Sequence, residues 1–484
     1  MKPILRLPEL RELESRHAAA DPSLMERAGA VATDLILELL EGRREPALIV
    51  CGPGNNGGDG LVAARFLKER GHTPVVVFAG DPARLPPDAA RALEAWNWMG
   101  GHCHESIPAG AYALAVDALF GIGLTRPVEG RHAELVAAMS GLGCPVLSLD
   151  IPSGLDSETG RLLGRAVRAD RTLSFIALKP GLLTLDGPDH CGTLTVADLG
   201  LGPDFGAAGG RVLEKNLFQA LVRPRPRNSH KGSFGSAGIL GGAPGMAGAA
   251  LLAGRAALKL GAGRVHVGML ERLAADPVQP ELMLREAAQV LSLATALAIG
   301  PGLGDSPAAV DLLRAAIAAE LPLVLDADAL NLLAAHPSLG RELPRRRAPT
   351  LITPHPAEAA RLLGTDTAAV QGDRLAAALD LARRFRAATV LKGAGSIVAT
   401  ADGGWCINAS GNPGLASAGS GDVLTGIVVA LLAQGWPADT ALAAAVHLHG
   451  EAAEWLVAAG VGPVGMAAGE LIDSARHVLN TWIA

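Results

Sequence analysis

The chain has 484 residues, more than one hydrophobic core usually supports, so two or three domains are the starting expectation. Hydrophobic residues make up 49% and charged residues 19%, which excludes a disordered chain. Lys plus Arg number 42 against 48 Asp plus Glu, and no basic stretch is dense enough to form a nucleic-acid-binding face.

The five cysteines are scattered without a CxxC pair, which argues against a disulfide framework and a zinc site and favours a reducing compartment. Met1–Arg16 alternates charged residues and leucine, so we expect neither a secretory signal nor a membrane anchor there. Apolar runs such as Val423–Leu432 are too short to span a bilayer. We therefore expect a cytoplasmic protein that binds neither membranes nor nucleic acids.

The first half repeats a short β-branched run, a turn and a helical stretch between Leu35 and Val196. This alternation predicts a mostly parallel sheet with helices on both faces, a three-layer α/β/α domain over residues 1–212. Ligands of such a sheet bind at the carboxyl ends of its strands. The expected strands are Ala47–Cys51, Pro74–Phe78, Ala113–Val116, Val146–Asp150 and Thr172–Phe175, separated by helices such as Leu61–Arg70 and Ala89–Met99.

Between about Gly202 and Arg227 the composition changes to glycine, proline and arginine, and we place a linker there over residues 213–227. A second α/β pattern follows over residues 228–484, and no internal repeat relates it to the first. Its expected strands are Ala237–Leu240, Arg264–Val267, Ala296–Ile299, Leu323–Asp326, Thr350–Thr353 and Val390–Lys392, and its last expected helices are Gly421–Gln434, Asp439–Ala458 and Ala467–Thr481.

A glycine-rich segment, Cys51–Gly60, lies between an expected strand and a helix that we expect to begin near Gly58. Its glycines allow positive φ and let backbone N–H groups approach an anion, while the positive end of the helix points at the same place. The segment therefore predicts a phosphate site. A tight turn between strand and helix, without a ligand, is the alternative interpretation.

Two further strand ends carry a carboxylate followed by glycines, at Asp117 and at Asp150. In a doubly wound sheet these ends converge on one crevice, where Asn56, Asp117 and Ser153 can offer oxygen ligands to one monovalent cation. The alternative is that Asp117 and Asp150 only cap the loops that follow them.

Asn55–Gly60, Gly121–Arg126 and Asp150–Gly154 resemble the NAD(P)H-hydrate epimerases, which interconvert the R and S forms of NADH and NADPH hydrated at C6 of the nicotinamide ring. The resemblance spans essentially the whole first half and implies a Rossmann-like domain. It implies that potassium binds Asn56, Asp117 and Ser153. The residues that it implies for the hydrate are Asn55, Asn56, Gly57, Gly58, Asp59, Gly121, Ile122, Gly123, Leu124, Thr125, Arg126, Pro127 and Asp150.

The same resemblance places Asp150 at the reacting carbon, where epimerisation needs an acid/base group that helps to lose and regain the hydroxyl. Lys179 is a second catalytic candidate, and an ion-pair partner or an exposed lysine are equally good interpretations of it. His132 stands where members of the family often have a tyrosine.

The strongest motif in the chain is Gly419–Asp422, which precedes a long and almost wholly apolar helix. Unpaired N–H groups and the helix dipole form an anion hole there, and Asp422 places a carboxylate in the first turn. Phosphoryl transfer needs donors for the developing charge and a base at the acceptor hydroxyl. An ordinary glycine-rich helix entry with a first-turn acid is the alternative.

This loop resembles the GxGD motif of the ribokinase-like superfamily, in which the aspartate, here Asp422, acts as catalytic base. From about Phe218 onward the chain also looks like the ADP-dependent NAD(P)H-hydrate dehydratases, which implies a ribokinase-like α/β domain. Six further segments carry that likeness in the same order: His230–Gly235, Gly241–Ala249, Gly300–Gly304, Leu325–Leu330, Thr353–Glu358 and Leu391–Ser396.

The likeness implies two neighbouring pockets in this half, one for the hydrate and one for the adenine nucleotide. Outside the family argument, His355 is equally well explained as a loop or capping histidine. The implied hydrate-binding residues are Ala249, Gly302 or Gly304, His355 and Asp422, and the implied nucleotide-binding residues are Lys392, Gly393, Ala394, Gly395, Ser396 and Gly421.

The two resemblances together imply a fused metabolite-repair enzyme that acts on the hydrates NADHX and NADPHX. One half epimerises the hydrates, and the other dehydrates the S form with ADP, which becomes AMP and phosphate. Magnesium then bridges the phosphates, largely through water. We expect no macromolecular partner apart from further copies of the chain in a homo-oligomer.

Two alternatives belong to other functional classes. In the first, the second half is a ribokinase-like kinase for a small molecule and leaves the phosphate on its product. In the second, the first half is a nucleotide-binding module without catalytic activity.

Overall fold

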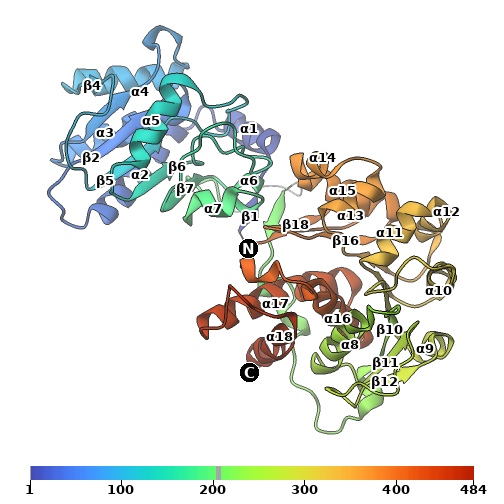
Figure 1. The fold of residues 1–484 in the computed structure, drawn as a ribbon. Helices are drawn as coiled ribbons and strands as arrows, with labels where there is room; N and C mark the ends of the chain where they lie inside the picture. The colour runs from blue at the N-terminus through green and yellow to red at the C-terminus, as the bar shows by residue number, and fades with distance from the viewer. Residues whose placement is uncertain (1, 203–208, 484) are drawn as a thin grey trace. The chain divides into compact units, whose positions relative to one another are not determined.

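The computed structural model describes residues 2–202 and 209–483, which fold into two compact units (Figure 1). The first unit comprises Lys2–Arg211, and the second begins at Val212. Within the described residues, every helix falls short of the length and apolar character needed to cross a membrane.

In the first unit, all neighbouring strands of the main sheet are parallel, in the order β4-β3-β2-β5-β6-β7-β8. The chain runs outward from β2 to β4 and then returns to place β5 on the other side of β2, so a topological switch point lies between β2 and β5. The strands are β2 (Ala47–Cys51), β3 (Val75–Phe78), β4 (Cys103–His104), β5 (Leu114–Ala118), β6 (Val146–Leu149), β7 (Arg171–Phe175) and β8 (Thr193–Ala197), and a short β1 (Pro3–Ile4) pairs with β9 (Gly210–Val212).

Helices cover both faces of this sheet because successive strand residues point to opposite sides. Ile49 packs in the core under α1 to α4, whereas Leu48 and Val50 pack in the core under α5. Along α2 the buried residues recur at helical spacing, which gives the helix one apolar face. The helices are α1 (Leu7–Arg16), α2 (Leu24–Leu40), α3 (Asn55–Glu69), α4 (Pro87–Trp98), α5 (Gly130–Ser140), α6 (Pro180–Leu183) and α7 (Gly187–Cys191), with a 3-10 turn η1 (Pro82–Arg84).

The expectation that α3 begins near Gly58 is wrong, because the helix already begins at Asn55. The described glycines of Cys51–Gly60 all have negative φ, so left-handed backbone does not explain them. Close packing does. A Cβ on Gly52 would lie 1.8 Å from the carbonyl oxygen of Leu119, and a Cβ on Gly57 would lie 2.0 Å from that of Gly52.

The second unit contains a mixed sheet with the order β18-β17-β16-β15-β14-β13-β10-β11-β12. Strands β10 to β16 run parallel, and β16, β17 and β18 form an antiparallel edge that we did not expect. A second switch point lies between β10 and β13. The strands are β10 (Ser236–Gly241), β11 (Arg264–Met269), β12 (Met283–Arg285), β13 (Ala296–Ile299), β14 (Leu323–Leu325), β15 (Thr350–Ile352), β16 (Ala388–Leu391), β17 (Ser396–Ala399) and β18 (Trp405–Asn408).

One face of this sheet is covered by α8 (Ala247–Lys259), α16 (Ser420–Ala433), α17 (Ala438–Ala458) and α18 (Ala468–Ile483). Helices α16 and α8 touch closely, since a Cβ on Gly426 would lie 2.2 Å from the carbonyl oxygen of Ala253. The other helices lie on the opposite side of the sheet (Figure 1): α9 (Ala287–Leu293), α10 (Pro307–Ala318), α11 (Asp328–Ala335), α12 (Pro337–Gly340), α13 (Pro356–Leu363), α14 (Thr367–Gly372) and α15 (Arg374–Phe385).

The segment 213–227, where we expected a linker, contains the 3-10 turns η2 (Lys215–Leu217) and η3 (Gln219–Leu221). Leu213 and Phe218 are buried in the core of the second unit. The Arg225 guanidinium lies 3.7 Å from the ring centre of Phe234. This segment therefore packs as part of the second unit. Three further 3-10 turns are η4 (Lys231–Phe234), η5 (Leu343–Arg345) and η6 (Pro413–Leu415).

Candidate active sites

A cavity of about 720 Å³ lies at the switch point of the first unit, where the chain leaves β2 and β5. Its walls come from the start of α3, the loop after β5 and helix α1. The predicted residues that line it are Asn55, Asn56, Asp59, Gly121, Ile122, Gly123, Leu124, Thr125, Arg126, Asp150 and Lys179. Gly57, Gly58 and Pro127 are not part of its lining.

Asp150 and Lys179 form a buried ion pair at the wall of this cavity. The Lys179 ammonium also donates to the hydroxyl of Ser174 at 2.9 Å and to the carbonyl oxygen of Phe175 at 2.9 Å, so it is not an exposed lysine. Asp150 has φ +66°, a left-handed conformation that only Gly, Asn and Asp adopt readily. Its second carboxylate oxygen accepts from the N–H of Ile122 at 3.3 Å, so the carboxylate is held in one orientation.

Asp117 and Ser153 lie together behind the same loop. Asp117 is fully buried and accepts from the Ser153 hydroxyl at 2.6 Å and from the Ser153 N–H and Ser148 hydroxyl at 2.8 Å. Burial raises the pKa of Asp117 although these hydrogen bonds oppose it. Both polar atoms of the Asn56 side chain are buried without a hydrogen-bond partner among the described residues. Such a group is costly unless a ligand satisfies it.

Helix α1 brings residues to the cavity that sequence analysis missed, notably Arg11, Glu14 and His17. Burial raises the pKa of Glu14, and the Asp150 charge raises it further. Burial and the charges of Asp150 and Glu14 likewise raise the pKa of Asp59 well above its usual value. With Asp88, four carboxyl groups therefore line this cavity, and Asp59 and Glu14 retain protons at higher pH than free carboxyl groups do.

In the second unit, three of the predicted hydrate residues, Ala249, Gly302 and Gly304, lie at the switch point between β10 and β13. Gly302 has φ +56°, and a Cβ there would lie 3.2 Å from the Cβ of Ala249. The N–H of Gly304 donates to the Asp328 carboxylate at 2.8 Å. Backbone from the loop after β13 is thus held against the start of α8 and α11.

Asp326 follows β14 directly and is the most extensively bonded carboxylate of this site. It accepts from the Lys392 ammonium at 2.9 Å, from the Thr353 hydroxyl at 2.7 Å and from the Thr425 hydroxyl at 2.8 Å. Burial alone raises the pKa of Asp326, but Lys392 and these hydrogen bonds bring it below its ordinary value. The pair is therefore ionised.

Asp422 lies in the first turn of α16, after Gly419 with φ +89°. Burial and the negative charge of Asp326 raise the pKa of Asp422 to about 7, although Lys392 opposes the shift. A Cβ on Gly421 would lie 3.3 Å from the Lys392 ammonium nitrogen. The start of the helix thus combines the positive end of the helix dipole, an ammonium group and a carboxyl group that titrates near neutral pH.

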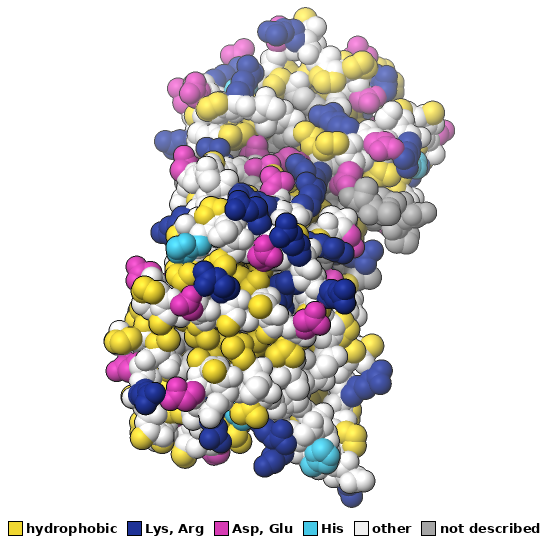
Figure 2. Space-filling view, turned by 90° about the vertical axis from the view of Figure 1, so that its right-hand side faces the viewer, with side chains coloured by type: hydrophobic (Ala, Val, Ile, Leu, Met, Phe, Trp, Pro, Cys, Tyr) yellow, Lys and Arg dark blue, Asp and Glu magenta, His cyan; other side chains and the backbone are white. Residues whose placement is uncertain are grey.

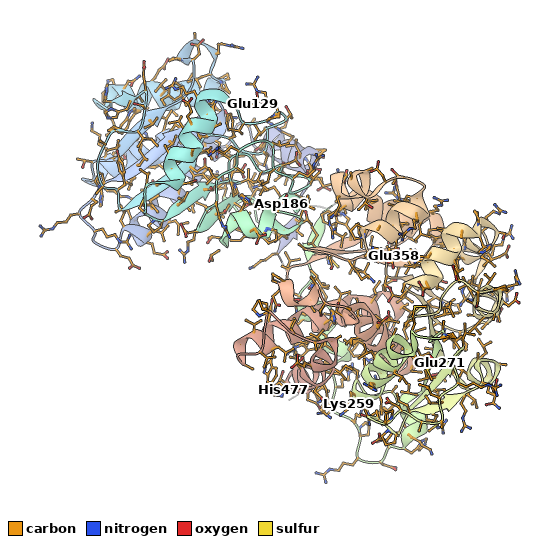
Figure 3. The ribbon with its side chains drawn as sticks, viewed as in Figure 1. Glu129, Asp186, Lys259, Glu271, Glu358 and His477 are labelled. Atoms are coloured by element: carbon orange, nitrogen blue, oxygen red, sulfur yellow. The ribbon has the colours of Figure 1, made fainter. Side chains whose placement is uncertain are left out.

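His355 caps the start of α13, which confirms the capping interpretation. Its Nδ1 accepts from the N–H of Ala357 at 3.1 Å, and the Glu358 carboxylate accepts from the N–H of His355 at 2.8 Å. Glu358 projects from the first turn of α13 (Figure 3). Burial, together with the nearby charge of Lys392, lowers the pKa of His355. The ring is therefore neutral at neutral pH.

The predicted nucleotide residues Lys392–Ser396 form the turn between β16 and β17. The Ser396 hydroxyl closes it by accepting from the N–H of Gly393 at 3.2 Å and donating to its carbonyl oxygen at 3.0 Å. Beneath the turn lies Arg374, which is buried and donates to the carbonyl oxygen of Lys392 at 3.3 Å. Burial lowers the pKa of Arg374 to about 10.

Comparisons with known proteins cover both units. Residues 237–476 match the family model for NAD(P)H-hydrate dehydratase, and residues 22–181 match that for the YjeF-related protein N-terminus. The bifunctional NAD(P)H-hydrate repair enzyme of Coxiella burnetii is 38% identical over 494 residues, 98% of each chain. That of Escherichia coli is 39% identical over 469 residues, 94% of this chain and 89% of the relative. The chain belongs to the bifunctional NAD(P)H-hydrate repair enzymes.

The second half of this repair enzyme also matches solved structures. An ADP/ATP-dependent NAD(P)H-hydrate dehydratase from Bacillus subtilis, co-crystallised with ATP and Mg²⁺, matches with a TM-score of 0.51 and 30% identity, over 56% of this chain and 99% of that chain. A ribokinase-like superfamily protein from Enterococcus faecalis matches with a TM-score of 0.50 and 26% identity, over 56% of this chain and 96% of that chain. The expected ribokinase-like fold is confirmed.

Three residues of the dehydratase half escaped the sequence analysis as site residues: Asp326, Glu358 and Thr425. Asp326 had a usable signal, because an acid directly after a buried parallel strand lies where ligands bind. Thr425 had none, since its position in an apolar helix gives no hint that its hydroxyl reaches a strand end.

The Asp326 pair yields a stability prediction. Replacing Asp326 by Ala leaves the Lys392 ammonium without its closest partner, and we expect a loss of about 3–5 kcal/mol in the free energy of unfolding. The measurement is urea denaturation of the second unit's transition. Asp311→Ala, which removes an exposed carboxylate paired with Arg314, is the matched control and should cost less than about 1 kcal/mol. Equal effects of both substitutions would contradict the importance of the pair.

Proposed function

We propose that the first site epimerises the R and S hydrates of NADH and NADPH, and that the second dehydrates the S form with ADP, releasing AMP and phosphate. The full-length similarity to the bifunctional repair enzymes supports both activities. The observation that carries the proposal is Asp422, a carboxyl group with a pKa of about 7 beside the Lys392 ammonium at the start of α16. That combination suits transfer of a phosphoryl group to an alcohol.

In the dehydratase site, Asp422 accepts the proton of the C6 hydroxyl while that oxygen attacks the β-phosphorus of ADP. The bond from the β-phosphorus to the bridging oxygen breaks, and AMP leaves. The N–H groups at Gly419–Gly421 and the Lys392 ammonium stabilise the charge that develops on the phosphoryl oxygens. The phosphate ester is then expelled from C6 by the ring nitrogen lone pair, and loss of a proton from C5 restores the dihydronicotinamide.

Among the predicted pocket residues, Ala249, Gly302 or Gly304 and His355 hold the hydrate, while Gly421 and the Lys392–Ser396 turn hold the nucleotide. Arg374 acts as a support for that turn through its contact with the carbonyl oxygen of Lys392. The neutral ring of His355 is about half exposed, and its Nε2–H, which lies 3.3 Å from the Glu358 carboxylate, can donate to a carboxamide or hydroxyl oxygen of the substrate in place of Glu358.

Magnesium fits this half, because the carboxylates of Asp328 and Glu358 are close enough to raise the pKa of Asp422 and are the oxygen donors that Mg²⁺ prefers. These two residues would hold it through water, with the nucleotide phosphates as its main ligands. When bound, the ion neutralises phosphate charge. The Bacillus subtilis dehydratase that was co-crystallised with ATP and Mg²⁺ supports this assignment.

In the epimerase site, Asp150 acts as the acid/base group at C6: it relays a proton from the paired Lys179 ammonium to the departing hydroxyl, which leaves as water, and returns a proton to Lys179 when water adds back. Lys179 fixes its carboxylate through the buried ion pair. Of the other predicted hydrate residues, Asn55, Asn56, Asp59 and those from Gly121 to Arg126 line the cavity and hold the hydrate, while Gly57, Gly58 and Pro127 lie outside its lining. Potassium fits Asn56, Asp117 and Ser153, since the Asn56 amide has no hydrogen-bond partner in the part of the chain that the structure describes and Asp117 is a buried acid. When bound, potassium would place a positive charge next to the side-chain oxygen atoms of these three residues.

A cytoplasmic location and a homo-oligomeric state stay predictions. So does the absence of nucleic-acid and membrane partners.

Two substitutions should separate the activities. Asp422→Asn removes the base, and we expect dehydration of the S hydrate to fall about 10²–10⁴-fold while epimerisation continues. Asp150→Asn keeps a residue that tolerates positive φ but loses the charge opposite Lys179. We expect epimerisation to fall by a similar factor in this variant while dehydration of the S hydrate continues. The assay follows NADH absorbance and AMP release from each epimer with ADP. A stable phosphorylated product without NADH would instead identify a small-molecule kinase, and unchanged epimerisation in Asp150→Asn would identify a binding module.

The pKa of Asp422 sets the pH dependence of the dehydratase. The base accepts a proton only when ionised, so kcat/KM should fall as the pH drops through about 7 and level off above it. Asp326→Asn removes a charge that raises this pKa, so any residual activity should show its acidic limb at lower pH. Steady-state rates across this range are the measurement. A profile that is flat through pH 7 in the unmodified enzyme would rule out Asp422 as the base.

Arg11 gives the epimerase site a test of substrate recognition. One of its guanidinium nitrogens lies 3.4 Å from where a Cβ on Gly123 would stand, and its pairing with Glu14 is long, at 3.9 Å. We expect this cation to contact the substrate pyrophosphate, so Arg11→Ala should raise KM about tenfold and leave kcat nearly unchanged. Arg16→Ala, on the same helix and paired with Glu12, is the control. Equal KM values for both variants would remove Arg11 from the site.

A further inference from the structure

A second cavity, of about 580 Å³, lies in the second unit and shares no lining residue with the dehydratase site. It is formed at the carboxyl-terminal ends of α11, α13 and α15, with α12 and η5 beside them. Helices α11 and α13 begin at Asp328 and next to His355, so the cavity lies at the far ends of two helices that start in the dehydratase site. We call it the basic cavity.

Three arginines line the basic cavity, Arg341, Arg361 and Arg384, and its lining contains no acidic residue. Within the described residues, none of the three forms an ion pair. Arg361 donates to the Asn331 side-chain oxygen at 2.9 Å, and the Arg384 guanidinium lies 5.6 Å from the ring centre of Phe385. Three full positive charges therefore face one space without a counter-charge.

Several arginines close to these three in the sequence have a partner of their own. Arg345 pairs with Glu342 at 2.9 Å, and Arg383 pairs with Asp380 at 3.5 Å. Arg346 donates to several backbone carbonyl groups. Acids are therefore present in this part of the chain, and they pair with Arg345 and Arg383, which do not line the basic cavity.

Arginines in the last turn of a helix also offset the partial negative charge of its C-terminus. That charge is about half an elementary charge per helix, so three helix ends neutralise only about half of the three guanidinium charges. A net positive potential remains in the cavity. Figure 2 faces the right-hand side of Figure 1, where α12 lies, and shows Lys and Arg side chains together with Asp and Glu around a hydrophobic area of the second unit.

We propose that the basic cavity binds a small phosphate-bearing ligand, with the phosphate held by Arg341, Arg361 and Arg384. The planar guanidinium group matches two phosphate oxygens at once, which makes phosphate the preferred anion. Apolar side chains of Leu333, Leu362 and Phe385 complete the lining and suit an organic body on that phosphate. The volume lies within the usual range for small-molecule sites. This inference does not depend on the proposed function.

Calorimetric titration of the full-length chain without added nucleotide tests the proposal, because ADP carries phosphate and would compete for the basic cavity. Binding that persists in the double variant described next belongs to another site. The probes are phenyl phosphate, inorganic phosphate and phenol. We expect phenyl phosphate to bind, phenol not to bind, and the affinity for phenyl phosphate to fall at least about tenfold in the double variant Arg361→Ala/Arg384→Ala. Equal affinity for inorganic phosphate would assign the site to the free ion, whereas tighter binding of phenyl phosphate would assign it to organic phosphates.

The double variant Arg345→Ala/Arg383→Ala is the matched control, because it removes two neighbouring arginines that point away from the cavity, and it should bind as the unmodified chain does. Arg361→Lys keeps the positive charge but loses the planar guanidinium group that donates two parallel hydrogen bonds to phosphate, so it should bind phenyl phosphate with intermediate affinity. Thermal unfolding of each variant verifies its fold. Equal weakening in both double variants, or no binding by the unmodified chain, would overturn the proposal.

Discussion

The dehydratase half depends on one buried interaction, the ion pair between Lys392 and Asp326. The pair fixes an ammonium group next to the start of α16, where a nucleotide phosphate can use it. Asp326 also anchors Thr353 and Thr425, so one carboxylate ties together the ends of β14, β15 and β16 and the first turns of α16. Its negative charge, with burial, raises the pKa of Asp422. The position of the Lys392 ammonium and the protonation state of Asp422 therefore both depend on Asp326.

The epimerase half reaches a comparable arrangement with different strands. Lys179 follows β7 and pairs with Asp150 after β6, again at the carboxyl ends of parallel strands. In the first half the site lies where the strand order reverses, because loops from two neighbouring strands diverge there and leave space between them. In the second half the site residues extend from that point, after β10 and β13, to the ends of β14, β15 and β16. The glycines at these points serve close backbone approach, as Gly52 does against Leu119 and Gly302 does against Met246.

Much of this could be predicted from the sequence. The parallel strands appear as β-branched runs, and strand-end acids such as Asp150 and the Gly419–Asp422 loop carry their own chemical signal. The antiparallel edge β17–β18 was not predicted because apolar and polar residues alternate only weakly along it. The start of α3 was predicted too late, because its first turn consists of polar residues and glycine and shows no helical apolar spacing. The contribution of α1 to the epimerase cavity could not be foreseen, since it depends on tertiary packing of a helix outside the matched family segment.

The raised pKa of Asp422 sets function against stability. A carboxyl group whose pKa is about 7 in the folded protein and near 4 in the unfolded chain binds its proton more tightly when folded. Its contribution to stability is therefore greatest at low pH and declines as the pH rises from the unfolded pKa to the folded one. Lys392 limits this loss by opposing the shift. Ionisation of Asp422 therefore lowers the stability of the fold, yet the ionised form is the one that phosphoryl transfer requires.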